Sequence, residues 1–184
     1  TPLPAACVDT GMGLERVTAV VQGKLNNYDT DLFAPLIEAT AKLAGVEYGA
    51  NPATDISLRV IADHLRATTF LVSDGVLPGN EGRGYVLRKI MRRALRHGRK
   101  LGLERPFLAD LVSELVARMQ KAYPELRATE GTVKKIVRVE EDRFSTTLKQ
   151  AFAVFDTVAA STKTGILSGA DAFKLYDTYG LSLD

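Results

Sequence analysis

Two groups of residues in this sequence have types and spacings that could do chemistry. The first is the segment DTGMGLER, in which Gly11 and Gly13 lie between the carboxylate of Asp9 and the guanidinium of Arg16. Two glycines allow a tight turn and the close approach of a flat ligand, and a helix that begins after them favours an anionic group. The segment could therefore bind a nucleotide. The alternative is that its Gly-x-Gly turn is a packing device between a strand and a helix.

The second group is a run of basic residues, GRGYVLRKIMRRALRHGRKLG, which holds eight lysines and arginines and no acid although the formal net charge of the chain is only +2. Taken as a helix from Val86, it has apolar side chains within roughly 180° of arc and cations within an opposite arc of roughly 140°. The apolar arc contains Val86, Leu87, Ile90, Met91, Ala94, Leu95 and Leu101, and the cationic arc contains Arg88, Lys89, Arg92, Arg93, Arg96, Arg99 and Lys100. Arginine binds phosphate oxygens in pairs, so the pattern predicts a helix with one face in the core and one face that binds nucleic acid.

The loop VLPGNEGRG precedes this helix and carries Asn80, whose amide can both donate and accept toward a base edge. The helix could then hold backbone phosphates while the loop recognises a base. Three structural alternatives are a solvated cationic face, pairing of Arg83 or Arg88 with Glu81 or Asp74, and a purely conformational role for Asn80. The missing acids argue against a solvated face, because exposed helices usually alternate charges of both signs.

Helical periodicity predicts the elements that position these groups. A short strand is expected over residues 3–9, and helices over about 13–24, 32–43, 86–101, 107–123, 125–161 and 170–179, with a further helix between the polar linker NPATD and Asp74-Gly75. Asp29 or Thr30 is expected to cap the second helix, and Gly45 to end it. Pro106 is expected in the first turn of its helix, and Gly131 is the position at which the longest helix could be interrupted. Phe144, Phe152 and Phe155 of that longest helix are expected in the core.

Composition limits the class of protein. A length of 184 residues with 46% hydrophobic content fits one domain, or a domain with a remnant of another. Cys7 is the single cysteine, so no internal disulfide can form, and a reducing, cytoplasmic location is expected. Cys7, His64 and His97 are too few and too scattered to build a structural zinc site, so no metal site is expected. No membrane span or secretory signal is recognisable. The opening TPLPAACVDTG, without an initiating Met, suggests a fragment of a longer protein.

Three segments, DTGMGLER, ADHLRATTFLVSDGVLPGNEGRGYVLRKIMRRALRHG and AFKLYDTYG, together resemble the alanyl-tRNA synthetase family over nearly the whole chain. In that family the first segment is motif 3 of the class II catalytic core, and the helical domain after it recognises the acceptor stem of alanine tRNA. The resemblance implies a mainly α fold. A strand-turn-helix remnant of the class II catalytic core would occupy residues 1–27. A multi-helix tRNA-recognition domain would occupy residues 28–184.

The resemblance also implies roles for individual residues. Asp9 would hold the amino group of alanine, Gly11 and Gly13 would line the nucleotide site, and Arg16 would support ATP. Asn80 and Asp177 would recognise the G·U wobble pair of the acceptor stem, whose guanine amine is a free donor for a carboxylate in the wide minor groove of RNA. Arg83, Arg88, Arg92 and Arg93 would contact the tRNA. The sequence departs from the family pattern at Leu181-Ser182, where Phe-Pro is usual, and at Arg88-Lys89, where Arg-Arg is common.

The activity implied is the ATP-dependent attachment of alanine to its tRNA, with ATP, Mg²⁺ and alanine bound by the full-length enzyme. Motifs 1 and 2 and the zinc site of an editing domain are absent from this sequence, so the chain alone is expected to bind no cofactor and to be inactive. Neither a membrane nor DNA is an expected partner. Alternatives are a non-catalytic helical RNA-binding or scaffold module, a membrane-surface protein and a general nucleotide-binding enzyme.

Overall fold

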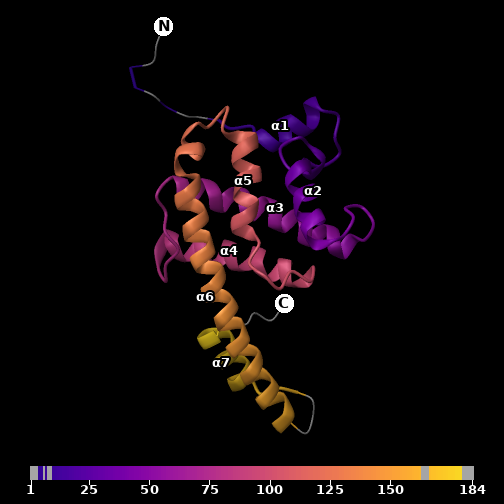
Figure 1. The fold of residues 1–184 in the computed structure, drawn as a ribbon, viewed down its shortest axis with the longest axis vertical. Coiled ribbons are helices and arrows are strands. Elements are labelled where there is room, and N and C mark those ends of the chain that lie inside the picture. Colours follow the sequence, from indigo (N-terminus) through magenta and orange to yellow (C-terminus); the bar gives the residue numbers. More distant parts are fainter. Residues whose placement is uncertain (1–3, 6, 8–9, 163–165, 180–184) are drawn as a thin grey trace.

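The helical periodicity of the sequence becomes a bundle of helices in the computed structural model, which describes residues 4–5, 7, 10–162 and 166–179 (Figure 1). The elements are α1 Leu14–Val21, the 3-10 helix η1 Asn27–Asp29, α2 Ala34–Ala44, α3 Pro52–Ser73, α4 Gly82–Lys100, α5 Leu108–Met119, α6 Glu125–Ser161 and α7 Gly169–Tyr179. The expected mainly α fold is therefore confirmed. No strand occurs in these described ranges, and most of the expected strand over residues 3–9 lies outside them.

Several expected helix boundaries are wrong because local capping decides them. The segment NPATD is the first turn of α3 rather than a linker, since the Asn51 side chain accepts a hydrogen bond of 2.9 Å from the Ala53 N–H. Similarly, Asn26 caps η1 where Asp29 or Thr30 was expected to cap α2, and α2 itself begins at Ala34 after Phe33 without a side-chain cap.

Helix α4 begins earlier than expected, α5 begins later than expected, and α6 has its expected bounds. Helix α4 begins at Gly82, four residues before Val86, and α5 begins after Phe107, so Pro106 lies outside its first turn. Helix α6 runs from Glu125 to Ser161 without interruption at Gly131, as one of the sequence alternatives predicted. Gly45 ends α2 in the left-handed region with a φ of 67°, which confirms that prediction too.

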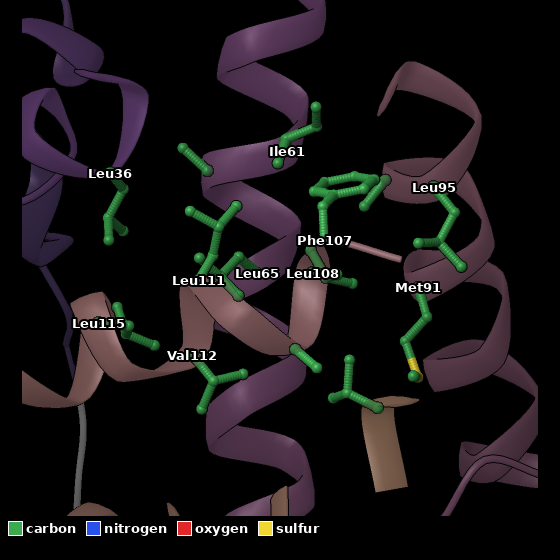
Figure 2. Close-up of a cluster of buried hydrophobic side chains, with 14 of the residues drawn as sticks. Leu36, Ile61, Leu65, Met91, Leu95, Phe107, Leu108, Leu111, Val112 and Leu115 are labelled. Carbon is green, nitrogen blue, oxygen red and sulfur yellow. The ribbon is translucent and has the colours of Figure 1, made fainter. Parts of the chain in front are cut away.

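The core lies where α3 crosses α4 and α5 (Figure 2). Ile61 of α3 and Met91 of α4 are fully buried there, together with leucines of α2 and α5. Phe107 packs directly over Gly98, because a Cβ at Gly98 would lie 2.3 Å from a carbon of the Phe107 ring. This contact brings the start of α5 close to α4.

Two side chains expected in the core are exposed. Val86 is 54% exposed, because it lies at the rim of the apolar arc of α4. Phe152 is 51% exposed, because it lies on the half of α6 that continues beyond the other helices, with α7 beside it (Figure 1). Phe144, nearer the middle of α6, is buried as expected.

Glu141 of α6 connects that helix to the start of α5. Its carboxylate accepts hydrogen bonds from the backbone N–H groups of Phe107, Leu108 and Ala109 at 2.8, 2.8 and 3.2 Å. These are among the donors that a helix leaves unpaired at its first turn. Burial raises the pKa of the Glu141 carboxyl above its ordinary value, while the three N–H donors act to lower it. A distant carboxylate therefore replaces the local cap that α5 lacks.

Candidate nucleic-acid interface

Seven of the eight lysines and arginines of α4 belong either to an exposed set or to a set that contacts α6, and the eighth, Arg96, is partly buried. Arg83, Lys89, Arg93 and Lys100 are exposed. Arg88, Arg92 and Arg99 follow one line along the helix, because positions four and eleven residues apart share a face. All three are partly buried, and all three contact α6. Part of the cationic arc predicted to bind phosphate is thus also an internal packing surface.

The partner of two of these arginines is Glu140 of α6, whose side chain is only 2% exposed. The Arg92 Nε donates to Glu140 Oε1 at 2.9 Å, and the Arg88 Nε lies 3.3 Å from the same oxygen as an ion pair. Arg92 also lies over the ring of Phe144, 5.4 Å from its centroid. The acidic partner of Arg88 is therefore neither Glu81 nor Asp74, the pairing that the sequence left open.

Arg88 also holds the loop that contains Asn80. Its guanidinium donates through Nη1 to the side-chain oxygen of Asn80 and through Nη2 to the carbonyl of Pro78 at 3.4 Å. A guanidinium carries donors only, so the amide of Asn80 must turn its oxygen toward Arg88. The amino group of Asn80, an exposed residue, is then the end of the amide that can contact a ligand. The geometry presents a hydrogen-bond donor at this point.

Two glycines let the Asn80 loop pack against the first turn of α4. The Gly79 N–H donates to the Gly84 carbonyl at 3.0 Å. A Cβ at Gly84 would lie 2.5 Å from the Leu77 carbonyl oxygen, a distance that real Cβ atoms do not adopt. Only glycine fits this position, and its absent side chain fixes how closely the loop approaches the helix.

An open groove lies between α4 and α6 next to this loop. It is lined by Arg88, Arg92, Asp142, Arg143, Thr146 and Thr147. Arg88 takes part in both the groove and the Asn80 contact, so the groove and the loop form one continuous surface. We call this surface, with the exposed cations Arg83, Lys89 and Arg93, the α4–α6 surface. Its arginines suit phosphate oxygens, and its exposed amide suits a base edge.

The residues of the expected nucleotide site are only partly described. Asp9 lies outside the described residues. Gly13, with a φ of 78°, precedes α1, and the first turn of that helix has no side-chain cap. Arg16 is exposed one turn further on. The start of a helix next to an arginine suits an anion such as a phosphate.

Helix α1 is attached to the bundle by an ion pair between Glu15 and Arg66 of α3. A backbone hydrogen bond and then Arg66 hold the pKa of the Glu15 carboxyl below its ordinary value, although burial acts to raise it. Arg66 in turn lies over the ring of Phe33, 4.4 Å from its centroid. The side chain of Asp177, at the other end of the chain, lies outside the described residues, although its backbone belongs to α7.

The sequence analysis missed four residues that line the groove, Asp142, Arg143, Thr146 and Thr147, and it missed the buried Glu140 that pairs with Arg88 and Arg92. Glu140 could have been found, because it interrupts an apolar stripe of α6 with steps of three and four residues. The buried members of this stripe are Val133, Val137, Phe144, Leu148 and Ala151. A carboxylate at a core position requires a partner. Nothing in the local pattern distinguishes Arg143 from an ordinary exposed arginine.

Two classes of site are not found in the described ranges. Within them, no group of three or more His, Cys, Asp or Glu side chains could hold a metal ion. A search of the same residues finds no helix that is both long and apolar enough to cross a membrane.

Comparison with known proteins identifies relatives over the whole chain. Residues 1–184 match the family model described as tRNA synthetases class II (A). The chain is 55% identical over 185 residues to the alanine–tRNA ligase of Acidithiobacillus ferridurans, covering 100% of this chain and 21% of that protein. It is 53% identical over 183 residues to the alanine–tRNA ligase of Thermotoga maritima, again with 100% of this chain and 21% of the relative covered. The chain thus spans about a fifth of the length of the curated relatives it matches.

Proposed function

Since the chain belongs to the class II (A) family of tRNA synthetases, we propose that it is the part of an alanine–tRNA ligase that binds the acceptor stem of alanine tRNA. We further propose that it recognises the G·U wobble pair of that stem through Asn80 and Asp177. The observation that carries this proposal is the oriented amide of Asn80 next to the cations of α4. Cations hold the phosphates of the stem, and the amide contacts a base edge.

The orientation of Asn80 limits which base atom it can contact. With its oxygen held by Arg88, the amide offers its amino group, which needs an acceptor on the RNA. Minor-groove edges of bases supply such acceptors, and the minor groove of A-form RNA is wide enough for a side chain to reach them. The guanine amine of the wobble pair is a hydrogen-bond donor, so it requires an acceptor on the protein. The carboxylate of Asp177 would supply that acceptor.

Helix α6 supports both elements of this proposed recognition. The Asn80 loop is connected to α6 through Arg88 and Glu140, and α7, which carries Asp177, packs along α6. One helix can thus position two groups that lie 97 residues apart in the chain. We propose that residues 28–184 form this recognition domain and residues 1–27 part of the catalytic core.

In the whole ligase, ATP and Mg²⁺ would supply the phosphoryl chemistry that activates alanine. This chain would contribute Gly11, Gly13 and Arg16 to the ATP site and Asp9 to the alanine site. Of the class II motifs, the sequence resembles motif 3, so we propose that the chain alone gives no ATP–pyrophosphate exchange, and measurable exchange contradicts this. We propose a cytoplasmic location, where its tRNA substrate is found.

Replacing Arg93 with alanine is expected to weaken binding of an acceptor-stem hairpin by a similar factor whether the hairpin carries the G·U pair or a G·C pair in its place. Arg93 is exposed on α4, and a phosphate contact carries no sequence information. The slope of log K against log salt should fall by about 0.7 to 1, the value of one phosphate contact. Titration of fluorescent hairpins at several salt concentrations measures both quantities.

Lys42 provides a matched control, because it lies on α2, away from the α4–α6 surface. Lys42→Ala removes one positive charge from the chain and is expected to leave the salt slope unchanged. An equal loss of slope for both variants would show that only the net charge matters and would remove Arg93 from the interface. Absence of any salt-dependent binding to either hairpin would contradict the proposed function itself.

A further inference from the structure

We propose that Glu140 is a positioning residue for base recognition, because its buried carboxylate fixes Arg88 and Arg88 fixes the amide of Asn80. The inference rests on the proposed function and adds to it a residue of α6 that touches no RNA. It follows from a chain of three side chains, in which Glu140 pairs with Arg88 and Arg88 donates to Asn80.

Glu140 occupies a core position of α6. It stands in the apolar stripe of α6 between Val137 and Phe144, where a leucine would remain buried without any partner. Burying a carboxylate is costly, and a buried ion pair is seldom more stable than apolar side chains of the same size. Fold stability alone therefore gives a weak reason for a carboxylate at this position, and its partners give a better one.

Glu140 contacts the two arginines in different ways. Glu140 Oε1 accepts a hydrogen bond from the Arg92 Nε, and the Arg88 Nε, which is buried and makes no hydrogen bond, lies 3.3 Å from the same oxygen as an ion pair. The carboxylate charge thus lies against the inner edge of the Arg88 guanidinium. The outer nitrogens of Arg88 remain available, and they donate to Asn80 and Pro78. We infer that this ion pair keeps the inner edge of the guanidinium against α6 and so directs the two outer donors toward the Asn80 loop.

Without the Glu140 carboxylate, Arg88 would be free to move. An arginine side chain has large rotamer freedom, and Arg88 is next to the open groove into which it could turn. Once Arg88 leaves, the Asn80 amide can rotate and present either its oxygen or its amino group. An amide without a fixed orientation can satisfy an acceptor or a donor on the RNA, so it discriminates poorly between base pairs.

The test uses the variants Glu140→Leu and Glu140→Gln in the 184-residue chain. The affinity ratio for acceptor-stem hairpins with G·U and G·C pairs is expected to fall about tenfold in Glu140→Leu, the size of a single lost base contact. Glu140→Gln keeps an acceptor oxygen for the arginines and is expected to recover part of the ratio. In an Asn80→Ala background, Glu140→Leu is expected to change the ratio no further, since the two residues act in series.

Glu141→Gln is the matched control, because Glu141 is the next residue of α6 and equally buried but bonds to the start of α5. It is expected to lower the melting temperature while leaving the G·U to G·C ratio unchanged. A Glu140→Leu protein that melts cooperatively and keeps the wild-type ratio would overturn the positioning role. If the wild type itself binds the G·U and G·C hairpins with equal affinity, the proposed function is overturned instead. Failure of the positioning role and failure of the proposed function therefore give different results.

A second readout needs no RNA. In a nitrogen-15 spectrum, the side-chain NH₂ resonances of Asn80 are expected to have the shifts of a single hydrogen-bonded orientation in the wild type. The shifts are expected to average over several orientations in Glu140→Leu, and to do so only in part in Glu140→Gln. Glu141→Gln is expected to keep the wild-type resonances. Unchanged Asn80 resonances in Glu140→Leu and Glu140→Gln would overturn the inference, even if one variant proved too unstable for binding measurements.

Discussion

Glu141→Ala is expected to lower the free energy of unfolding by about 4 kcal/mol, since three buried backbone N–H groups lose their acceptor and each costs about 1–3 kcal/mol if nothing replaces it. These N–H groups belong to Phe107, Leu108 and Ala109 at the start of α5. A negative charge at a helix start also interacts favourably with the helix dipole, and that interaction is lost too. Urea unfolding followed by circular dichroism measures the loss.

Two further variants determine whether this loss comes from the hydrogen bonds. Glu141→Gln keeps one acceptor oxygen, so about half of the loss is expected. Asp142→Ala changes the next residue, which is exposed, and is expected to alter the free energy of unfolding by less than about 0.5 kcal/mol. A loss below about 1 kcal/mol for Glu141→Ala would contradict the proposed origin of this stability.

Gly84→Ala is expected to displace the Asn80 loop, lower the free energy of unfolding by about 2 kcal/mol and abolish discrimination between G·U and G·C hairpins. The added Cβ would lie 2.5 Å from the Leu77 carbonyl oxygen and 3.1 Å from the Gly79 nitrogen. Both are backbone atoms, so the loop can relieve the clash only by moving away from α4. The hydrogen bond from Gly79 to Gly84 should break as it moves.

Gly131→Ala is the control for the Gly84 variant, because Gly131 lies inside α6 with nothing within 4 Å of a Cβ added there. Alanine favours a helix over glycine by about 1 kcal/mol, so this variant is expected to be more stable than the wild type. If Gly84→Ala lowers the free energy of unfolding and Gly131→Ala raises it, the effect at Gly84 comes from its close contact with the loop. A general preference of helices for alanine would raise the free energy of unfolding in both variants. Equal stabilisation by both would contradict the role given to Gly84.

The helices could be predicted from the sequence because their causes are local. The apolar spacing of α6 predicted its full length from Glu125 to Ser161, and Gly45 predicted the end of α2. Caps were predicted less well, because several polar residues stood close together and each could cap. At the start of α3, for example, Asn51 and Asp55 both lie near the first turn, and Asn51 is the residue that caps it.

Contacts between distant segments could not be predicted in this way. The basic run of α4 indicated a partner of negative charge, and for Arg88 and Arg92 one such partner is Glu140, which follows Arg92 by 48 residues. A pattern confined to α4 cannot distinguish an internal carboxylate from an external phosphate. Glu141 likewise bonds to residues 32 to 34 positions earlier in the chain. The packing of α6 against α4 and α5 creates both contacts.

The most direct test of the account is the affinity of this chain for two acceptor-stem hairpins of alanine tRNA that differ only in a G·U or a G·C pair. The wild type is expected to prefer the G·U hairpin by about 1–3 kcal/mol, the usual cost of one wrong pair. Asn80→Ala and Asp177→Ala should each bring the two affinities together while leaving the salt slope unchanged. Equal affinities of the wild type for both hairpins would contradict the assignment of Asn80 and Asp177 to the G·U pair.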